Sequence, residues 1–292
     1  MNRINKPLPF KRKHFILRRW IDRLIVLYCL VVLGSVLTAF TITQFNIIEL
    51  DYEAMDFQSI LTPPLTNGHI LGTDYLGRDL FNRLLLGTHA YLLPGLMAVS
   101  ISILFGALLG SLTLFANKRL RKVITLSTEL MQTTPRLVIL LLIIAIFEAN
   151  IYYVMLVIGI TNIPTVANLI SHRIDILRNK RFIEASIANA TPIHILIFKH
   201  ILWYNCRTIL ISQAALGMAE AVLMETSLSY LGFGVQEPTP SWGNMVQAGS
   251  NYLLQGNLWS SSIPALAIMS VLLAFYLLAE VVVKQLNKRH SL

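Results

Sequence analysis

The sequence predicts an all-α polytopic membrane protein with six transmembrane helices, and two observations carry that prediction. Hydrophobic residues make up 55% of the 292 residues and charged residues only 13%, whereas a soluble domain contains about 25% charged residues. The apolar residues gather in long stretches, and nearly all Lys and Arg lie on alternate connections between them. Because about 20 apolar residues of helix cross a bilayer core of about 30 Å, these stretches are long enough to span a membrane.

Six apolar stretches define the predicted spans. They cover residues 24–42, 90–116, 123–147, 151–171, 209–229 and 263–283. The third stretch is the least regular, because it contains Glu129, Pro135 and Arg136. Proline removes a helical hydrogen bond and is expected to kink this span. The charged residues are expected to place part of it at the membrane interface or against protein rather than lipid.

The distribution of positive charge predicts the orientation of the chain. Every Lys and Arg except Arg78, Arg83 and Arg136 lies in the arm 1–23, on the second connection, on the fourth connection 173–207 or in the tail 284–292. Because cytoplasmic segments carry the excess of positive charge, both termini are predicted to be cytoplasmic. This bias accounts for the net charge of +9. We therefore expect the arm to meet anionic lipid headgroups and predict no nucleic-acid partner.

The connections between the spans contain nothing typical of an enzyme. Each is too short for a catalytic domain of ordinary size, and no P-loop pattern for nucleotide occurs. His194 and His200 come nearest to metal-ligand spacing, but six residues place them on different faces of a helix. The chain is therefore predicted to carry no catalytic residue, no metal site and no cofactor of its own.

The cytoplasmic connection 173–207 is predicted to fold as helix, turn and helix. Thr191 followed by Pro192 is typical of an N-cap and a first helical turn. Asn189 suits a left-handed turn position between the two helices, and the second helix is expected to run into the fifth span. An amphipathic, basic segment of this kind either rests on lipid or docks a cytoplasmic partner.

This same connection resembles a known motif. Glu184-Ala185-Ser186, followed by Ala190 and by His200 within a Lys-His-Ile-Leu run, is similar to the EAA loop of ABC-importer permeases. The resemblance implies that this loop is the coupling helix, seated in a groove of an ATPase. Glu184 would be its polar anchor, and Ala185 and Ser186 would be kept small for close seating.

Two extracytoplasmic segments narrow the resemblance to one family. Residues 69–87 are similar to an LGTDxLGRD segment and contain Asp74, Arg78 and Asp79. Residues 225–245 are similar to an LSFLGLGxxxPxPxWGxM segment and contain Trp242 and Asn244. From about residue 69 to the end of the sixth span, the chain resembles the C-type permease of dipeptide, oligopeptide and nickel ABC importers.

The resemblance implies the architecture of an ABC type I importer permease. The first helix 24–42 and the extracytoplasmic loop 43–89 would precede a permease core, 90–283, of five transmembrane helices. The chain would be one of two homologous permeases in a bacterial plasma (inner) membrane, together with one or two ABC ATPases and an extracytoplasmic solute-binding protein. ATP and Mg would be bound by the ATPases. The two permeases would form the path for a peptide, with nickel, a metal chelate or an antimicrobial peptide as alternatives.

Two residues depart from the family's coupling loop. Ala190 stands where the pattern has Gly, and Trp203 stands where it has Pro. We therefore expect the loop to seat differently, on a cognate rather than a shared ATPase.

The outer motifs are expected to have a structural role. Asp74, Arg78 and Asp79 are expected to pair with one another. With Trp242 and Asn244, they are expected to hold the outer gate and the permease–permease contact. The alternative is that these segments dock the solute-binding protein.

Polar residues inside the fifth span are candidates for the translocation path, because charge in hydrocarbon costs several kcal/mol. Glu220 lies well inside this span, Glu225 lies nearer its outer end, and Gln213 shares a face with Glu220 at a spacing of seven. We expect these three residues to line the path, where Glu220 would meet an amino group or a cationic metal complex. The alternative for Glu220 is a salt bridge or hydrogen bond to the partner subunit.

Functions of other classes fit the sequence less well. An ion channel would need a repeated pore loop or a ring of charges, and the sequence shows neither. A secondary transporter would typically show an inverted repeat, and no such repeat is found. An intramembrane enzyme would need catalytic residues on facing spans. An orphan permease-like membrane scaffold stays open, and co-occurrence with an ATPase would distinguish it.

Overall fold

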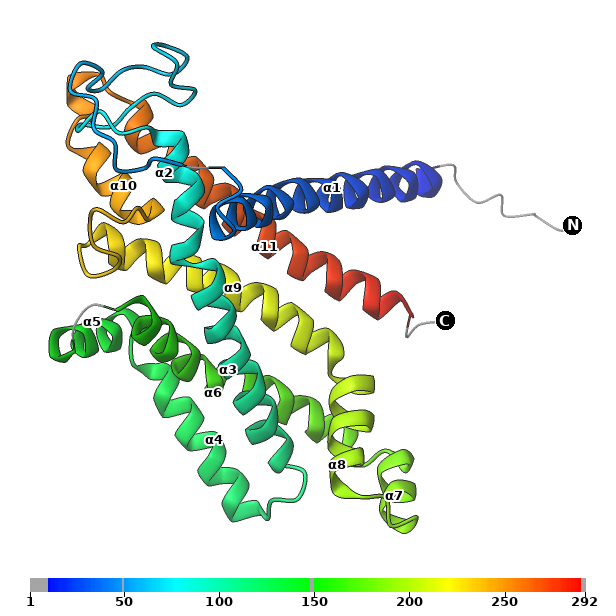
Figure 1. Ribbon diagram of the computed structural model, residues 1–292. Coiled ribbons are helices and arrows are strands. Elements are labelled where there is room, and N and C mark those ends of the chain that lie inside the picture. Colours follow the sequence, from blue (N-terminus) through cyan, green and yellow to red (C-terminus); the bar gives the residue numbers. More distant parts are fainter. Residues whose placement is uncertain (1–9, 49, 148–149, 290–292) are drawn as a thin grey trace, which may run out of the picture.

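The computed structural model describes residues 10–48, 50–147 and 150–289, and this part of the chain is helical, with no β-strand (Figure 1). Residues 1–9 of the predicted basic arm and 290–292 of the predicted tail lie outside the described residues. The helices are α1 (Phe10–Gln44), α2 (Leu80–Leu86), α3 (Leu92–Leu112), α4 (Lys118–Thr133), α5 (Arg136–Ile146), α6 (Ile151–Leu177), α7 (Arg181–Ala188), α8 (Ile193–Ile195), α9 (Arg207–Tyr230), α10 (Trp242–Ser250) and α11 (Trp259–Arg289). Two 3₁₀-helices, η1 (Gly87–Ala90) and η3 (Leu253–Gln255), and a π-helix, η2 (Leu196–Trp203), complete them.

The prediction of an all-α membrane fold is confirmed. Within the described residues, five helical segments are long and apolar enough to cross a bilayer, namely Trp20–Gln44, Leu80–Leu112, Ile151–Leu177, Arg207–Tyr230 and Trp259–Leu286. The second begins ten residues before the predicted start at residue 90, because α2, η1 and α3 follow one another directly.

The remaining candidate span is broken, as its proline indicated. Helices α4 and α5 are bent by 77° relative to each other. Pro135 lies at the break, with an extended ψ of 120°. The pair counts as one bent span or as a re-entrant segment, so the kink predicted at Pro135 is confirmed.

Small residues allow α3 and α6 to pack closely. Gly106 and Gly110 lie one turn apart on α3, and Gly159 lies on the facing surface of α6. A Cβ atom on Gly110 would lie 2.7 Å from the carbonyl oxygen of Ala167, and one on Gly159 would lie 2.7 Å from that of Ala98. Small residues of this kind permit close backbone contact between helices in a membrane.

We expect Gly110→Ala to destabilise the protein by about 1–3 kcal/mol, since the added methyl group overpacks this contact. The apparent unfolding midpoint in detergent measures the effect. Gly34→Ala is the matched control, because a Cβ atom on this α1 glycine meets nothing within 4 Å. A midpoint lowered equally by both substitutions would contradict the packing account.

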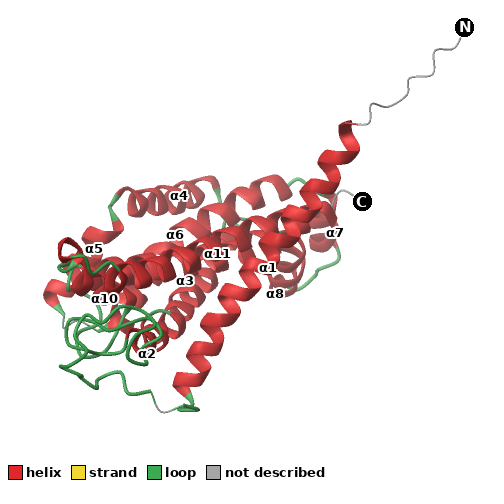
Figure 2. Cartoon of the chain, turned by 90° about the horizontal axis from the view of Figure 1, so that it is seen from above, coloured by secondary structure: helices red, strands yellow, loops and turns green. Residues whose placement is uncertain are grey.

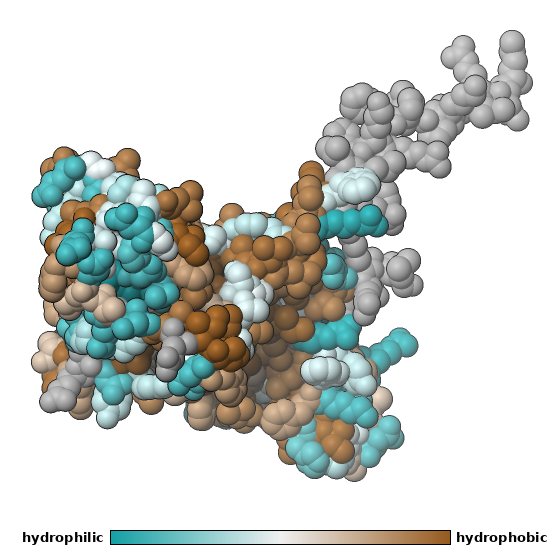
Figure 3. All heavy atoms as spheres, turned by 45° about the horizontal axis from the view of Figure 1, so that its top comes forward, coloured by the Kyte–Doolittle hydropathy of each residue, from teal (hydrophilic) through white to brown (hydrophobic). Residues whose placement is uncertain are grey.

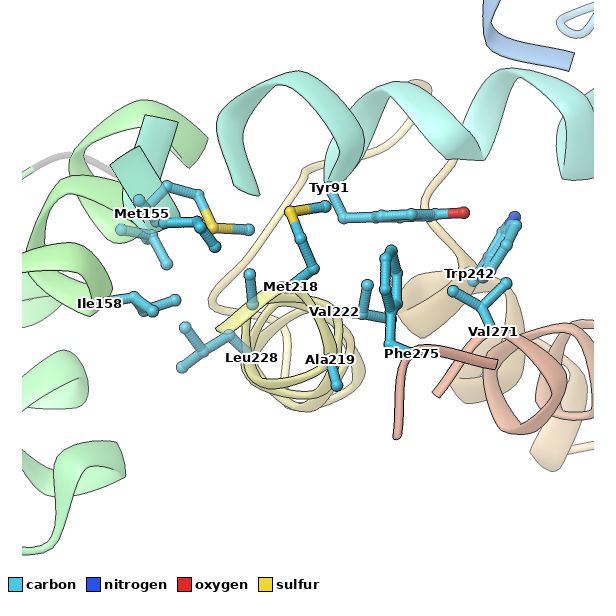
Figure 4. Packing of buried hydrophobic residues seen from close by; sticks show 14 of the residues in the cluster. Tyr91, Met155, Ile158, Met218, Ala219, Val222, Leu228, Trp242, Val271 and Phe275 are labelled. Atoms are coloured by element: carbon cyan, nitrogen blue, oxygen red, sulfur yellow. The ribbon is translucent and has the colours of Figure 1, made fainter. Parts of the chain in front are cut away.

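The central core gathers around α9. Tyr91, Met218, Val222 and Trp242 belong to one buried cluster, to which α3, α6, α9, α10 and α11 all contribute (Figure 4). A second buried cluster lies where α7 and η2 meet α3 and α6, and it includes Cys206. Cys206 and Cys29 are both buried, free thiols.

Helix α1 packs chiefly along α11 and leaves much of its apolar surface outside. The Tyr28 hydroxyl donates to the carbonyl of Ser270 at 3.0 Å, while Leu24, Leu30 and Leu37 stay exposed. Figure 2 shows α1 along one side of the bundle. Figure 3 shows polar side chains at the two ends of the molecule and hydrophobic ones between them. This surface suits a protein surrounded by lipid.

Candidate functional site

The predicted coupling loop contains a short helix, α7, and one face of this helix packs against the rest of the protein. Ile183 of α7 is 3% exposed and belongs to the second buried cluster. Glu184 and Ala185 of the same helix are exposed, Ser186 is half-buried, and Ile187 is 61% exposed. Helix α7 lies at the opposite end of the molecule from α10 (Figure 1). It therefore presents a carboxylate, small residues and one apolar side chain outward from a fixed base.

The turn after α7 differs from the prediction at one residue. Asn189 has a φ of −81°, whereas Ala190 has a φ of +51°. The left-handed residue is therefore Ala190, at the position where the family pattern has Gly. The Ala190 amide donates to the carbonyl of Ile187, and the Thr191 amide donates to that of Ser186, so the local hydrogen bonds impose this conformation on an alanine.

The start of the next helix was also predicted one residue too early. Pro192, not Thr191, occupies the N-cap of α8 and has no side-chain capping bond. Helix α8 continues as the π-helix η2, which ends at Trp203, and α9 begins at Arg207 after a short break. The second helix therefore leads to the fifth span, as predicted, but is not continuous with it. His200 lies in η2, half-buried, with its ring centroid 6.2 Å from that of Tyr204. It belongs to the junction with α9.

We expect Ala190→Gly to stabilise the protein by about 1 kcal/mol, because glycine adopts positive φ without the steric cost that Cβ imposes. The unfolding midpoint should rise by about 2–4 °C. Ala188→Gly, in the last turn of α7, is the control and should lower stability by a similar amount. A shift of the same sign in both variants would show that the turn is not strained.

At the opposite end, four charged residues form a cluster that we call the outer charge cluster. Its members are Asp74, Arg78, Arg83 and Glu237. Arg78 bonds to Asp74 through Nε and to Glu237 through Nη1, both at 2.7 Å. Arg83 bonds to Glu237 through Nη2 at 3.1 Å and donates to the carbonyl of Pro238 at 3.2 Å. The cluster thus ties segment 74–83 to the loop after α9.

Burial makes these contacts obligatory. The Arg78 and Arg83 side chains are 3% and 1% exposed. Burial opposes the charge of Arg78, but the hydrogen bond to Glu237 and the charge of Asp74 outweigh it, so the pKa of this guanidinium is raised above its usual value. Arginine is not deprotonated in proteins, so both buried cations need carboxylate partners.

The pairing predicted for this segment is correct for Asp74 with Arg78 and wrong for Asp79. Asp79 caps α2 by accepting from the Asn82 amide at 3.0 Å, and its other oxygen lies 2.6 Å from Nδ1 of His69. In place of Asp79, Arg83 and Glu237 form ion pairs in the outer charge cluster. The sequence held a signal for Arg83, since it is one of the three cations that do not follow the cytoplasmic bias.

Trp242 and Asn244 lie within the chain's own packing. The Trp242 indole donates to the carbonyl of Leu84 at 2.8 Å, and its ring lies 4.8 Å from that of Tyr91. Asn244 forms a capping box with Ser241 and donates to the carbonyl of Thr239 at 3.0 Å. Both residues are buried, so they fix α10 against α2 and the preceding loop.

The three polar candidates on α9 do not share one environment. Gln213 and Glu220 are half-buried, and Glu220 forms an ion pair with Arg136 of α5. Glu225 is fully buried and accepts from the Ser229 hydroxyl at 2.6 Å. The salt bridge considered for Glu220 therefore exists, but within this chain. The arrangement separates Glu225 from the partly open face that carries Gln213 and Glu220.

Comparison with known proteins decides the family. Residues 102–291 match the family described as "Binding-protein-dependent transport system inner membrane component". The chain belongs to this family. The matched region begins within α3, reaches the end of α11 and includes the predicted coupling loop, α9 and α10. The expectation of a multi-pass permease subunit is thereby confirmed, and the channel, enzyme and secondary-transporter alternatives fall away.

Several relatives of this permease carry names that state a substrate. It is 36% identical to the di/tripeptide transport system permease protein DppC of Pseudomonas aeruginosa, over 76% of this chain and 74% of the relative. It is 34% identical to a probable D,D-dipeptide transport system permease protein, DdpC, of Escherichia coli, over 75% and 73% of the two chains. A putative peptide permease protein of Brucella suis is 33% identical, over 70% and 68%.

Proposed function

We propose that this permease forms half of the path through which an ATP-driven importer takes up a peptide, and that it receives the ATPase's movement through the loop around Glu184. The observation that carries the proposal is the construction of that loop. Ile183 fixes α7 to the buried cluster that also holds η2, and η2 leads into α9. A push on the exposed face of α7 is therefore passed to the helix that carries Gln213 and Glu220.

The proposed partners follow from which surfaces of the chain are open. A cytoplasmic ATPase, which binds ATP and Mg, would cover Glu184, Ala185 and Ile187. A second, homologous permease would lie opposite the open face of α9, with the path between them. A solute-binding protein would dock on the extracytoplasmic loops held by the outer charge cluster. In this orientation, both termini would lie in the cytoplasm. Ala190 replaces the Gly of the family's coupling loop, so this loop would seat differently from the usual one. We therefore propose a cognate ATPase whose groove fits it.

Peptide is the proposed substrate class. Support comes from the relatives, whose names specify dipeptides, di/tripeptides or peptides. The two long motifs alone also fit nickel or metal-chelate permeases, so the preference for a peptide substrate rests on the relatives.

Purification from the native membrane in mild detergent, with chemical crosslinking and mass spectrometry, tests the assembly. We expect a second permease and one or two ATPases to be recovered with this chain. Recovery of this chain alone, with and without crosslinker, would contradict the proposal and favour a permease-like scaffold.

A further inference from the structure

An arginine at the break of the bent span is held by two helices. Arg136 is the first residue of α5, directly after Pro135. Its Nη2 donates to Oγ1 of Thr165 at 2.9 Å and to Oδ1 of Asn162 at 3.3 Å, both on α6. Its Nη1 pairs with Glu220 of α9. The guanidinium is thus positioned by α6 through one nitrogen and paired with α9 through the other.

The ion pair lies near the middle of the α9 span and is partly open. Glu220 follows the start of α9 at Arg207 by about 20 Å along the helix, from a rise of about 1.5 Å per residue. The Arg136 and Glu220 side chains remain 24% and 23% exposed. Because charge in contact with hydrocarbon is costly, this exposed part must face water or protein rather than lipid.

The open face around the pair is polar and continues along α9. Gln213 and Ser227 are half-buried and lie seven residues on either side of Glu220, on the same face of the helix. Exposed Leu223 borders this stripe. A polar stripe with one cation and one anion at its centre is complementary to a molecule that carries both charges.

We propose that Arg136 and Glu220 bind the charged ends of the transported peptide, Arg136 the α-carboxylate and Glu220 the α-ammonium group, and that they pair with each other when the path is empty. The inference rests on the proposed function. Thr165 and Asn162 keep the guanidinium in place through Nη2 when Nη1 changes partner, and Nη1 then donates a charge-assisted hydrogen bond to the carboxylate of the peptide. Exchange of one ion pair for two leaves no charge unpaired, which avoids the main cost of buried charge.

The test compares peptides that lack one charged end. The complete importer is reconstituted in proteoliposomes with its binding protein, and uptake is measured for a tripeptide with free ends, its N-acetylated form and its C-amidated form. Each variant's rate is divided by the wild-type rate for the same peptide, which cancels the binding protein's own preference. Arg121→Gln is the control, because it removes an ion pair of the same chemistry, with Asp175 at 2.6 Å, on the neighbouring helix α4.

Each variant should be selective for one end of the peptide. Glu220→Gln should lower uptake of the free and C-amidated peptides about tenfold, as expected for a lost charged hydrogen bond, and leave the N-acetylated peptide unchanged. Arg136→Gln should lower uptake of the free and N-acetylated peptides and leave the C-amidated one unchanged. In the Arg121→Gln control, the relative uptake rates of the free, N-acetylated and C-amidated peptides should be equal.

Three further results test whether Arg136 and Glu220 bind the ends of the peptide. Equal fractional loss for all three peptides in both variants would overturn the inference, since it shows a purely structural pair. If the variants do not assemble, a wild-type complex with a peptide photo-reactive beside its N-terminus serves instead. Labelling of 207–230 supports the inference, and labelling confined to other helices overturns it. A wild-type complex without ATP-dependent uptake would instead remove the proposed function on which the inference depends.

Discussion

Replacing Glu184 by glutamine is expected to reduce ATP-driven peptide uptake about tenfold or more, within the usual range of coupling between two sites. Glutamine keeps the length and helix propensity of glutamate, and the side chain is exposed, so the fold should not change. What would be lost is the charge that we propose anchors α7 in the ATPase groove, because hydrogen bonds to a charged group are stronger than neutral ones. Uptake and the yield of co-purified ATPase measure the effect.

Glu280→Gln is the matched control for this prediction. Glu280 is also an exposed helical glutamate, paired with Lys284 at 2.6 Å on α11, and an exposed pair contributes about 0–1 kcal/mol. Its removal should leave uptake nearly unchanged. Normal uptake and normal ATPase recovery in Glu184→Gln would show that α7 is not the coupling element.

Asp74→Asn should have the largest effect on stability, about 3–5 kcal/mol, as expected when one partner of a buried ion pair is removed. One oxygen of Asp74 accepts from the amides of Leu76 and Arg78 at 2.8 and 2.9 Å, and the other accepts from Nε of Arg78. An asparagine amide must turn its NH₂ group toward one of these donors. It also leaves two buried guanidinium groups with Glu237 as their only carboxylate in the outer charge cluster.

The apparent unfolding midpoint in detergent should fall by about 10 °C in Asp74→Asn, from the usual relation between stability and midpoint in domains of this size. Asp175→Asn provides the comparison, because Asp175 is 44% exposed and pairs with Arg121 at the surface. Its midpoint should shift by no more than about 4 °C. Equal shifts would mean that the outer charge cluster does not stabilise the fold.

The elements that could be predicted from the sequence are those that depend on local pattern. Hydropathy places five spans and the bent sixth, and the missing amide of Pro135 accounts for the break. The helix–turn–helix form of 173–207 also follows from local residues. The position of the left-handed residue does not, because Asn189 is the better candidate by propensity, whereas the hydrogen bonds to Ile187 and Ser186 select Ala190.

The partners of charged residues could not be predicted, because they come from distant parts of the chain. Glu237 lies more than 150 residues from Arg83, and Arg136 and Glu220 are on separate helices. The signal in the sequence was the exception to the charge bias. The three cations outside the predicted cytoplasmic segments, Arg78, Arg83 and Arg136, all form ion pairs that join separate segments. Cations that break the positive-inside pattern therefore indicate ion pairs within the fold.

Uptake of a radiolabelled dipeptide by proteoliposomes that contain the purified importer tests the central claim most directly. The binding protein is supplied on the extracytoplasmic side and ATP on the other. We predict accumulation that requires both. Uptake that proceeds equally without ATP, or no uptake although all subunits are assembled, would contradict the account of this chain as a permease subunit of an ATP-driven peptide importer.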